Sequence, residues 1–205
     1  AHGSMRAGAW DRKKYVGNEL YKKVLGVVGL GKIGSHVTKV AKAMGMNVIA
    51  FDPFVSAERA QQMQVRLTTL EDLFRQADYI TLHIPRTPDT ENLVNAELLR
   101  TMKPTARIVN CARGGIVDEA AIAEAIETGV IAGAGLDVFA SEPLAQDSPL
   151  RGVERGLVLT PHLGASTEEA QENVAIDVAE QIRDVLLGLP ARSAVNIPGL
   201  SAEIC

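Results

Sequence analysis

A glycine-rich turn between an apolar run and a helical run constrains the fold of this 205-residue chain more than any other feature. Gly29-Leu30-Gly31-Lys32-Ile33-Gly34 directly follows the apolar run 23–28 and leads into the helical pattern 33–44. Because glycine has no Cβ, it permits a tight turn and a close approach of the helix to the strand. The segment therefore predicts a strand, a turn and a helix in immediate succession.

Short apolar runs alternate with helical patterns along the rest of the chain. The further predicted strands are 47–51, 79–83, 107–110, 132–138 and 157–160, with a weaker one at 65–67. The predicted helices are 33–44, 57–63, 70–76, 95–102, 118–128 and 166–187. Such alternation is typical of a parallel sheet with helices on both faces. We predict an α/β fold with a Rossmann-like, doubly wound parallel sheet, and one compact unit because no repeat or linker is visible.

The two ends of the chain carry separate predictions. Residues 1–5, Ala1-His2-Gly3-Ser4-Met5, are interpreted as the remnant of an expression vector, which leaves 6–205 as the folded domain. In the last helix, Ser166 is the predicted N-cap with Glu169 three residues later, and Gly188 and Pro190 predict its end.

Charge and composition exclude several classes of partner. The net charge is -4, and the basic residues are scattered among acidic ones, so no nucleic-acid partner is expected. No stretch approaches the ~18 apolar residues that span a bilayer, and no signal pattern opens the chain, so no membrane partner is expected. Cys111 and Cys205 form neither a CxxC pair nor a disulfide framework. We predict a soluble cytoplasmic protein without a metal site.

The glycine turn also has the spacing of a dinucleotide-binding loop. Gly29 permits the turn, Gly31 lets the backbone approach a pyrophosphate, and Gly34 lets helix and strand pack closely. The N-terminus of the following helix offers free N–H groups to phosphates. Asp52 ends the next predicted strand, 52 − 29 = 23 residues after the first glycine, where a carboxylate binds ribose hydroxyls and repels a 2′-phosphate. We predict that NAD, rather than NADP, is the cofactor.

Three later segments each follow a predicted strand. Because the carboxyl ends of parallel strands meet at one edge of a sheet, their polar residues are expected where a bound nicotinamide would lie. The segments are Asn110-Cys111-Ala112-Arg113-Gly114-Gly115, Leu136-Asp137-Val138-Phe139-Ala140-Ser141-Glu142-Pro143 and Pro161-His162-Leu163-Gly164-Ala165-Ser166-Thr167.

At these segments the chain resembles the D-isomer-specific 2-hydroxyacid dehydrogenases, and the resemblance runs from about 7 to 198. Together with Phe51-Asp52-Pro53-Phe54, the three segments are most similar to the branch of that family that acts on 3-phosphoglycerate. The resemblance implies an NAD-dependent oxidoreductase of a small-molecule 2-hydroxy acid. Its implied reaction converts 3-phosphoglycerate to 3-phosphohydroxypyruvate, the first step of L-serine biosynthesis.

Oxidation of a secondary alcohol requires a base for the hydroxyl proton, and His162 is the candidate because histidine titrates near neutral pH. A carboxylate on the other imidazole nitrogen would fix the tautomer and stabilise the imidazolium, and Glu142 fits that role. Arg113 can bind the substrate carboxylate with two hydrogen bonds. The family resemblance assigns the same three residues as catalytic.

The resemblance also implies contacts with the cofactor beyond the glycines and Asp52. Asp137 would hold the nicotinamide carboxamide, and Ile84 would contribute its backbone. The remaining implied contacts are Lys32, Ile33, Cys111, Ala112, Arg113, His162, Gly164 and Ala165. Cys111 is interpreted as a small buried residue beside the cofactor rather than a nucleophile, because no base adjoins it.

Members of this family build the active site between the cofactor domain and a substrate domain formed by both ends of the polypeptide. Few residues precede the first predicted strand here, and the chain ends at Cys205, soon after Val195-Asn196-Ile197-Pro198. We therefore expect a fragment without the substrate domain, poorly active alone. The resemblance implies a homodimer or higher homo-oligomer of the full-length protein, with 10–21 and 91–98 as a candidate surface.

Alternatives remain for the residues and for the function. Arg113 could cap a surface turn, Glu142 could be a solvated loop acid, and His162 could be structural. The substrate could instead be glyoxylate, hydroxypyruvate or lactate, since most residues that read its tail would lie in the other domain. A binding protein of another class, an NAD-sensing transcriptional corepressor, shares this fold and these residues.

Overall fold

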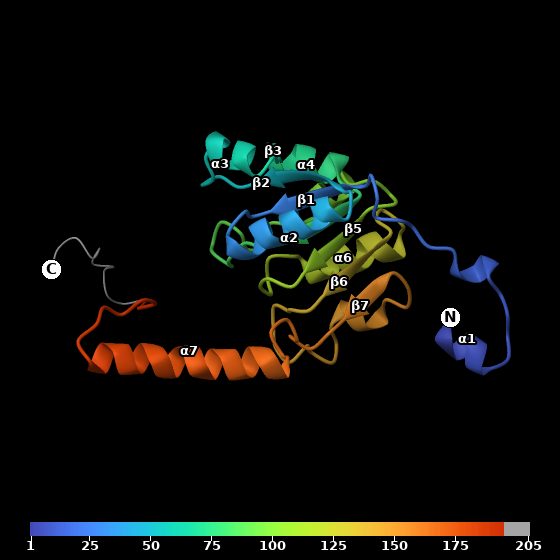
Figure 1. Cartoon of the computed structure of the whole chain (residues 1–205). Coiled ribbons are helices and arrows are strands. Elements are labelled where there is room, and N and C mark those ends of the chain that lie inside the picture. Colours follow the sequence, from blue (N-terminus) through green and yellow to red (C-terminus); the bar gives the residue numbers. More distant parts are fainter. Residues whose placement is uncertain (195–205) are drawn as a thin grey trace. The chain divides into compact units, whose positions relative to one another are not determined.

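A parallel sheet forms the centre of the first of two compact units, Ala1–Pro161, in this computed structural model (Figure 1). The structure describes residues 1–194, so Cys205 and the 195–198 segment lie outside the described residues. The strands are β1 (Val24–Val28), β2 (Asn47–Phe51), β3 (Arg66–Leu67), β4 (Tyr79–Leu82), β5 (Arg107–Asn110), β6 (Gly133–Leu136) and β7 (Leu157–Leu159). Every predicted strand is present, and most are shorter by one or more residues at an end.

The order of the strands is β3-β2-β1-β4-β5-β6-β7, and every pairing is parallel. The chain first adds strands on one side of β1 and then returns to add strands on the other side. In this register Val28 pairs with both Phe51 and Leu82, so β1, β2 and β4 end at the same edge. The predicted Rossmann-like, doubly wound sheet is confirmed, and its direction reverses between β1 and β4.

The helices of the first unit are α1 (His2–Arg6), η1 (Lys13–Tyr15), α2 (Lys32–Ala43), α3 (Ala57–Gln62), α4 (Leu70–Gln76), α5 (Ala96–Arg100), α6 (Glu119–Glu127) and η2 (Pro149–Gly152). Four of them, α3, α4, α5 and α6, begin at residues whose side chains cap them. Ser56, Thr69, Asn95 and Asp118 each accept a hydrogen bond from an N–H group of the helix that follows them. These caps stabilise helices that are too short to persist alone.

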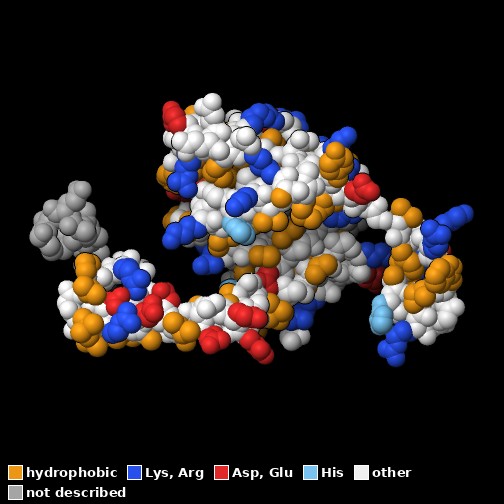
Figure 2. All heavy atoms as spheres, viewed as in Figure 1, with side chains coloured by type: hydrophobic (Ala, Val, Ile, Leu, Met, Phe, Trp, Pro, Cys, Tyr) orange, Lys and Arg blue, Asp and Glu red, His pale blue; other side chains and the backbone are white. Residues whose placement is uncertain are grey.

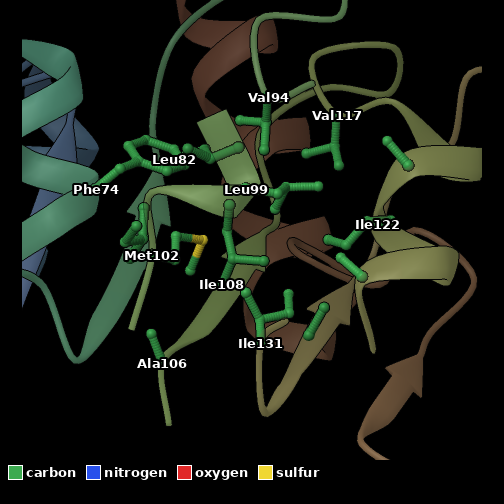
Figure 3. Close-up of a cluster of buried hydrophobic side chains, with 14 of the residues drawn as sticks. Phe74, Leu82, Val94, Leu99, Met102, Ala106, Ile108, Val117, Ile122 and Ile131 are labelled. Atoms are coloured by element: carbon green, nitrogen blue, oxygen red, sulfur yellow. The ribbon is translucent and has the colours of Figure 1, made fainter. Parts of the chain in front are cut away.

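Successive residues of the strands point to opposite faces of the sheet, and each face has its own apolar cluster. On one face Val27 and Ala50 pack with Ala41 of α2. On the other face Val28 packs in a larger cluster with α4, α5 and α6, whose side chains interdigitate in Figure 3. Within that cluster Phe74, Leu99 and Ile122 are fully buried. The sheet is therefore covered on both faces, as the apolar runs predict.

The second compact unit, His162–Cys205, contains the helix α7 (Glu168–Leu186). No residue of α7 is buried, and Figure 2 shows apolar and charged side chains at its surface. The structure thus divides into two compact units where the sequence predicts one. The cap is also shifted by one residue, since Thr167, not Ser166, accepts a hydrogen bond from the N–H of Ala170.

Among the described helices, none has both the length and the apolar character that a membrane span requires. α7 is long enough in residues, yet it begins with Glu168 and Glu169 and carries Arg183 in its last turn.

Candidate functional site

The glycine turn lies where the sheet changes direction, and its geometry depends on missing Cβ atoms. Gly29 has φ +95°, and a Cβ there would lie 2.5 Å from the carbonyl oxygen of His83. A Cβ on Gly34 would overlap the carbonyl oxygen of Gly29. The hydroxyl of Ser35 also donates to the carbonyl of Leu30 at 2.8 Å. The start of α2 therefore lies directly against the turn that ends β1, as the close-packing role of the third glycine requires.

Gly31 differs from Gly29 and Gly34 because no atom would contact a Cβ at this position. It is exposed at the N-cap of α2, and no atom lies within 4 Å of a Cβ built there. Lys32 and Ile33 follow it and are also exposed. A phosphate group could approach this backbone and the N-terminus of α2 without steric hindrance. The open position at Gly31, between two closely packed glycines, fits the pyrophosphate of a dinucleotide.

The Asp52 carboxylate is joined to the glycine turn by hydrogen bonds. Its Oδ2 accepts from the N–H of Leu30 at 2.7 Å, and its Oδ1 accepts from the N–H of Phe54 at 2.9 Å. The side chain is half-buried. A fixed negative charge beside the turn fits ribose hydroxyls, which can donate to it, and opposes a phosphate in their place.

The segment after β4 packs against the glycine turn. Ile84 is half-buried, and its Cγ2 lies 2.9 Å from the position of a Cβ on Gly29. His83 is also half-buried, and its Nε2 lies 3.0 Å from the hydroxyl of Thr81. Burial lowers the pKa of His83, which favours the neutral imidazole. The predicted contact of Ile84 with the cofactor stays a prediction.

The loop after β5 carries Arg113 and is held by the side chain of Asn110. That amide is 1% exposed; it donates to the carbonyl of Arg113 at 2.9 Å and accepts from the N–H of Ala112 at 3.0 Å. The Arg113 side chain itself is exposed, and its Nη1 donates to the carbonyl of Ala112 at 2.6 Å. A buried amide thus fixes the backbone from which the guanidinium extends.

Cys111 lies in the same loop, and the prediction that it is buried is wrong. Its side chain is exposed, because Cys111 begins the loop after β5 and not a buried position of the strand. Burial of part of the thiol, and then the negative charge of Asp137, raise the pKa of Cys111. A raised pKa disfavours the thiolate, which agrees with the prediction that Cys111 is not a nucleophile.

Asp137, directly after β6, is buried and hydrogen-bonded to the end of β5 and to Thr160, the residue after β7. It is 4% exposed, its Oδ1 accepts from the hydroxyl of Thr160 at 2.5 Å, and its N–H donates to the carbonyl of Asn110 at 3.0 Å. Buried carboxylates are costly unless they are paired, so this one has a defined place in the edge of the sheet.

Glu142 lies in the loop that follows Asp137. Its Oε1 accepts from the N–H of Phe139 at 3.0 Å, and the residue is exposed. A Cβ on Gly114 would overlap the carbonyl oxygen of Phe139, so the loop of Arg113 and the loop of Glu142 are in backbone contact. The structure therefore brings the loops of Arg113, Asp137 and Glu142 together at the carboxyl ends of β5 and β6.

His162, Gly164 and Ala165 belong to the second unit, and all three are exposed. His162 has φ 55°, a left-handed conformation that is uncommon for residues other than glycine. Such conformations cost about 1–3 kcal/mol and cluster at functional sites. The pairing of His162 with Glu142 stays a prediction.

The prediction of site residues omitted several side chains that hold the site loops. They are Asn110, Glu119, Arg151 and Thr160. For Asn110 and Thr160 the sequence did offer a signal, because each is a polar residue at the end of a predicted apolar strand. Within residues 1–194, no cluster of three or more histidine, cysteine or acidic side chains could hold a metal ion.

Comparison with known proteins agrees with this geometry. Residues 1–164 match the NAD-binding domain of the D-isomer specific 2-hydroxyacid dehydrogenases. D-3-phosphoglycerate dehydrogenase of Synechocystis is 66% identical over 100% of this chain and 36% of its own length. The enzyme of the same name from Bacillus subtilis is 49% identical over 99% of this chain and 38% of its own length.

Among solved structures, the TT0316 protein from Thermus thermophilus superposes with a TM-score of 0.84 at 36% identity, covering 95% of this chain and 61% of that one. The chain belongs to the D-isomer specific 2-hydroxyacid dehydrogenase family, as its NAD-binding domain. NAD is accordingly its cofactor, as the sequence predicts. The chain spans little more than a third of the length of the two relatives named above.

Proposed function

We propose that the protein containing this chain oxidises D-3-phosphoglycerate to 3-phosphohydroxypyruvate with NAD⁺, the first step of L-serine biosynthesis. The observation that carries the proposal is 66% identity, over the whole chain, with a D-3-phosphoglycerate dehydrogenase. The loops at the carboxyl ends of β5 and β6 support it, because they hold a guanidinium and a carboxylate in one place on the sheet edge.

In this proposal three side chains divide the chemistry. Arg113 binds the substrate carboxylate, since its exposed guanidinium extends from a loop fixed by a buried amide. His162 takes the hydroxyl proton, and Glu142 stabilises the imidazolium that forms. Bound NAD⁺ supplies the hydride acceptor.

The proposal also assigns the residues that hold the cofactor. The backbone of Gly31 and the N-terminus of α2 receive the pyrophosphate, and Asp52 receives the ribose hydroxyls. Asp137, which is buried beside β5, receives the nicotinamide carboxamide. The other predicted contacts, Lys32, Ile33, Ile84, Ala112, Gly164 and Ala165, are part of the same proposal.

The substrate is tested with the intact protein by measuring NADH formation. We expect kcat/KM for D-3-phosphoglycerate to exceed that for D-glycerate and D-lactate by at least ~10²-fold, because a site built for a polar group rejects analogues that lack it. A higher kcat/KM for an unphosphorylated acid would contradict the proposal. Binding of NADH without turnover of any 2-hydroxy acid would favour the NAD-sensing corepressor instead.

The role of His162 has its own test and a matched control. His162→Asn should lower kcat by about 10²–10⁴-fold, the usual contribution of a general base, while NADH still binds. His36→Asn is the control, because His36 is an exposed histidine of α2. Equal activity of the two variants would exclude His162 as the base.

The proposal also covers the oligomeric state of the protein and its location in the cell. We propose a homodimer or higher homo-oligomer, which light scattering of the intact protein checks. A cytoplasmic location, predicted from the cysteine pattern, is checked by cell fractionation.

A further inference from the structure

We infer that Glu119 and Arg151 are positioning residues that hold the segment 139–145, here called the Glu142 loop, and thereby set the Glu142 carboxylate. The inference rests on the proposed function, since it gives these residues a role only if Glu142 takes part in the reaction. Neither residue belongs to the predicted site, and both act on the backbone of the loop.

Glu119 holds the start of the loop. Its Oε1 accepts from the N–H of Ala140 at 2.7 Å, across 21 residues of sequence. The carboxylate is not needed to cap α6, because Asp118 already accepts from the N–H groups of Ala120 and Ala121. The position of α6 is fixed by packing, since its residue Ile122 is fully buried. A charged acceptor makes this a stronger hydrogen bond than a neutral one would be.

Arg151 holds the end of the loop. Its Nε donates to the carbonyl of Ala145 at 2.8 Å, and its Nη2 donates to the carbonyl of Leu144 at 2.9 Å. The planar guanidinium makes both bonds at once, which a lysine could not do in the same geometry. The neighbouring Leu150 is 1% exposed and belongs to the main apolar cluster, so Arg151 also extends from a fixed part of the fold.

Glu142 lies between these two attachments and is itself exposed. Its Oε1 accepts from the N–H of Phe139, which is 8% exposed. The loop is therefore fixed at Phe139 by burial, at Ala140 by Glu119, and at its end by Arg151. An exposed loop without such attachments would sample several positions of the carboxylate. Small errors of position matter, because a displacement of about 1 Å can cost ~10²-fold in rate.

The test compares variants of the intact protein in NADH formation from D-3-phosphoglycerate. Arg151→Met and Glu119→Ala should each lower kcat by about 10- to 100-fold, with KM and the Kd for NADH changed by less than about twofold. Glu119→Gln should recover most of kcat, because its amide oxygen can still accept from Ala140. The matched controls, Arg155→Met and Glu127→Ala, change exposed charges that have no side-chain hydrogen bond among the described residues, and they should keep kcat.

A double-mutant cycle separates positioning from general loop stability. In a Glu142→Gln background, Arg151→Met should have little further effect on kcat, since it acts through that carboxylate. Two outcomes would overturn the inference and leave the proposed function intact. One is an equal effect of Arg151→Met on kcat in both backgrounds. The other is wild-type kcat in both Arg151→Met and Glu119→Ala, while Glu142→Gln is impaired. Wild-type kcat in Glu142→Gln would overturn both the inference and the proposed role of Glu142.

Discussion

The two halves of the sheet build their parts of the site in different ways. In the glycine half, residues 24–84, the geometry comes from backbone atoms in contact, with Gly29 and Gly34 admitting no side chain. In the loop half, residues 107–160, Gly114 makes a similar backbone contact with Phe139, and buried polar side chains such as Asn110 and Asp137 add hydrogen bonds. Substitutions of Gly29 or Gly34 should therefore act through steric overlap, and substitutions of Asn110 or Asp137 through lost hydrogen bonds.

The largest effect is expected in the glycine half, at Gly34. A methyl group in Gly34→Ala would overlap the carbonyl oxygen of Gly29, and both belong to backbone that cannot move independently. We expect the free energy of unfolding of the chain to fall by about 3 kcal/mol, the upper part of the usual range for overpacking. Urea denaturation measures this change. A loss below about 0.5 kcal/mol would show that α2 can move away from β1 freely.

In the loop half, Asn110→Ala should have the next largest effect. The substitution leaves the carbonyl of Arg113 and the N–H of Ala112 without their partner, and Asn110 is 1% exposed. We expect a loss of about 2 kcal/mol in the free energy of unfolding. Activity of the intact protein should fall further than stability alone explains, because the loop carries Arg113. Asn95→Ala, an exposed helix cap, is the control; it should cost stability without this extra loss of activity.

Gly31→Ala sharpens the comparison because it separates binding from stability within the glycine half. The position of its Cβ is open, so the free energy of unfolding should change by less than about 1 kcal/mol, the cost of a poorer N-cap. Affinity for NADH should fall about tenfold, or ~1.4 kcal/mol, because the methyl group would lie at the proposed pyrophosphate site. Fluorescence titration with NADH measures this. Unchanged affinity would place the pyrophosphate elsewhere.

Asp52→Asn removes the negative charge beside the glycine turn and keeps most of the shape of the side chain. We expect the ratio of NADPH to NADH affinity to rise about fivefold, or ~1 kcal/mol, the scale of one charge pair about 4 Å apart in water. Because Asp52 also accepts from the N–H groups of Leu30 and Phe54, affinity for both cofactors should fall somewhat. An unaltered ratio in paired titrations would mean that Asp52 only stabilises the turn.

How much the sequence predicts also differs between the halves. The roles of Gly29, Gly34 and Asp52 depend on neighbours within one β-α-β unit, so spacing alone predicts them. The attachments of the loop half join residues far apart in sequence, such as Glu119 with Ala140 and Asp137 with Thr160. No local pattern predicts which polar side chains will meet after the strands pair, and these residues were missed.

The fold shows the same contrast. Buried strands are apolar whatever they pair with, so β1, β2 and β5 follow from composition and period. Whether Cys111 and the residues of α7 are buried depends on tertiary contacts, which the local sequence does not specify. The apolar residues of α7 predict a helix and do not specify its neighbour.

The smallest effect is expected in the glycine half, at His83 of the segment after β4. Burial lowers the pKa of His83, so the folded chain favours the neutral imidazole more than the unfolded chain does. Its contribution to stability is present above the unfolded pKa of about 6.5 and is lost as the pH falls toward the folded pKa, because only the unfolded state then binds the proton. Between pH 7.5 and pH 5, values that bracket about 6.5, Tm of the wild type should therefore fall more than Tm of His83→Gln. Parallel pH dependences of the two would show that His83 is protonated as readily in the fold as outside it.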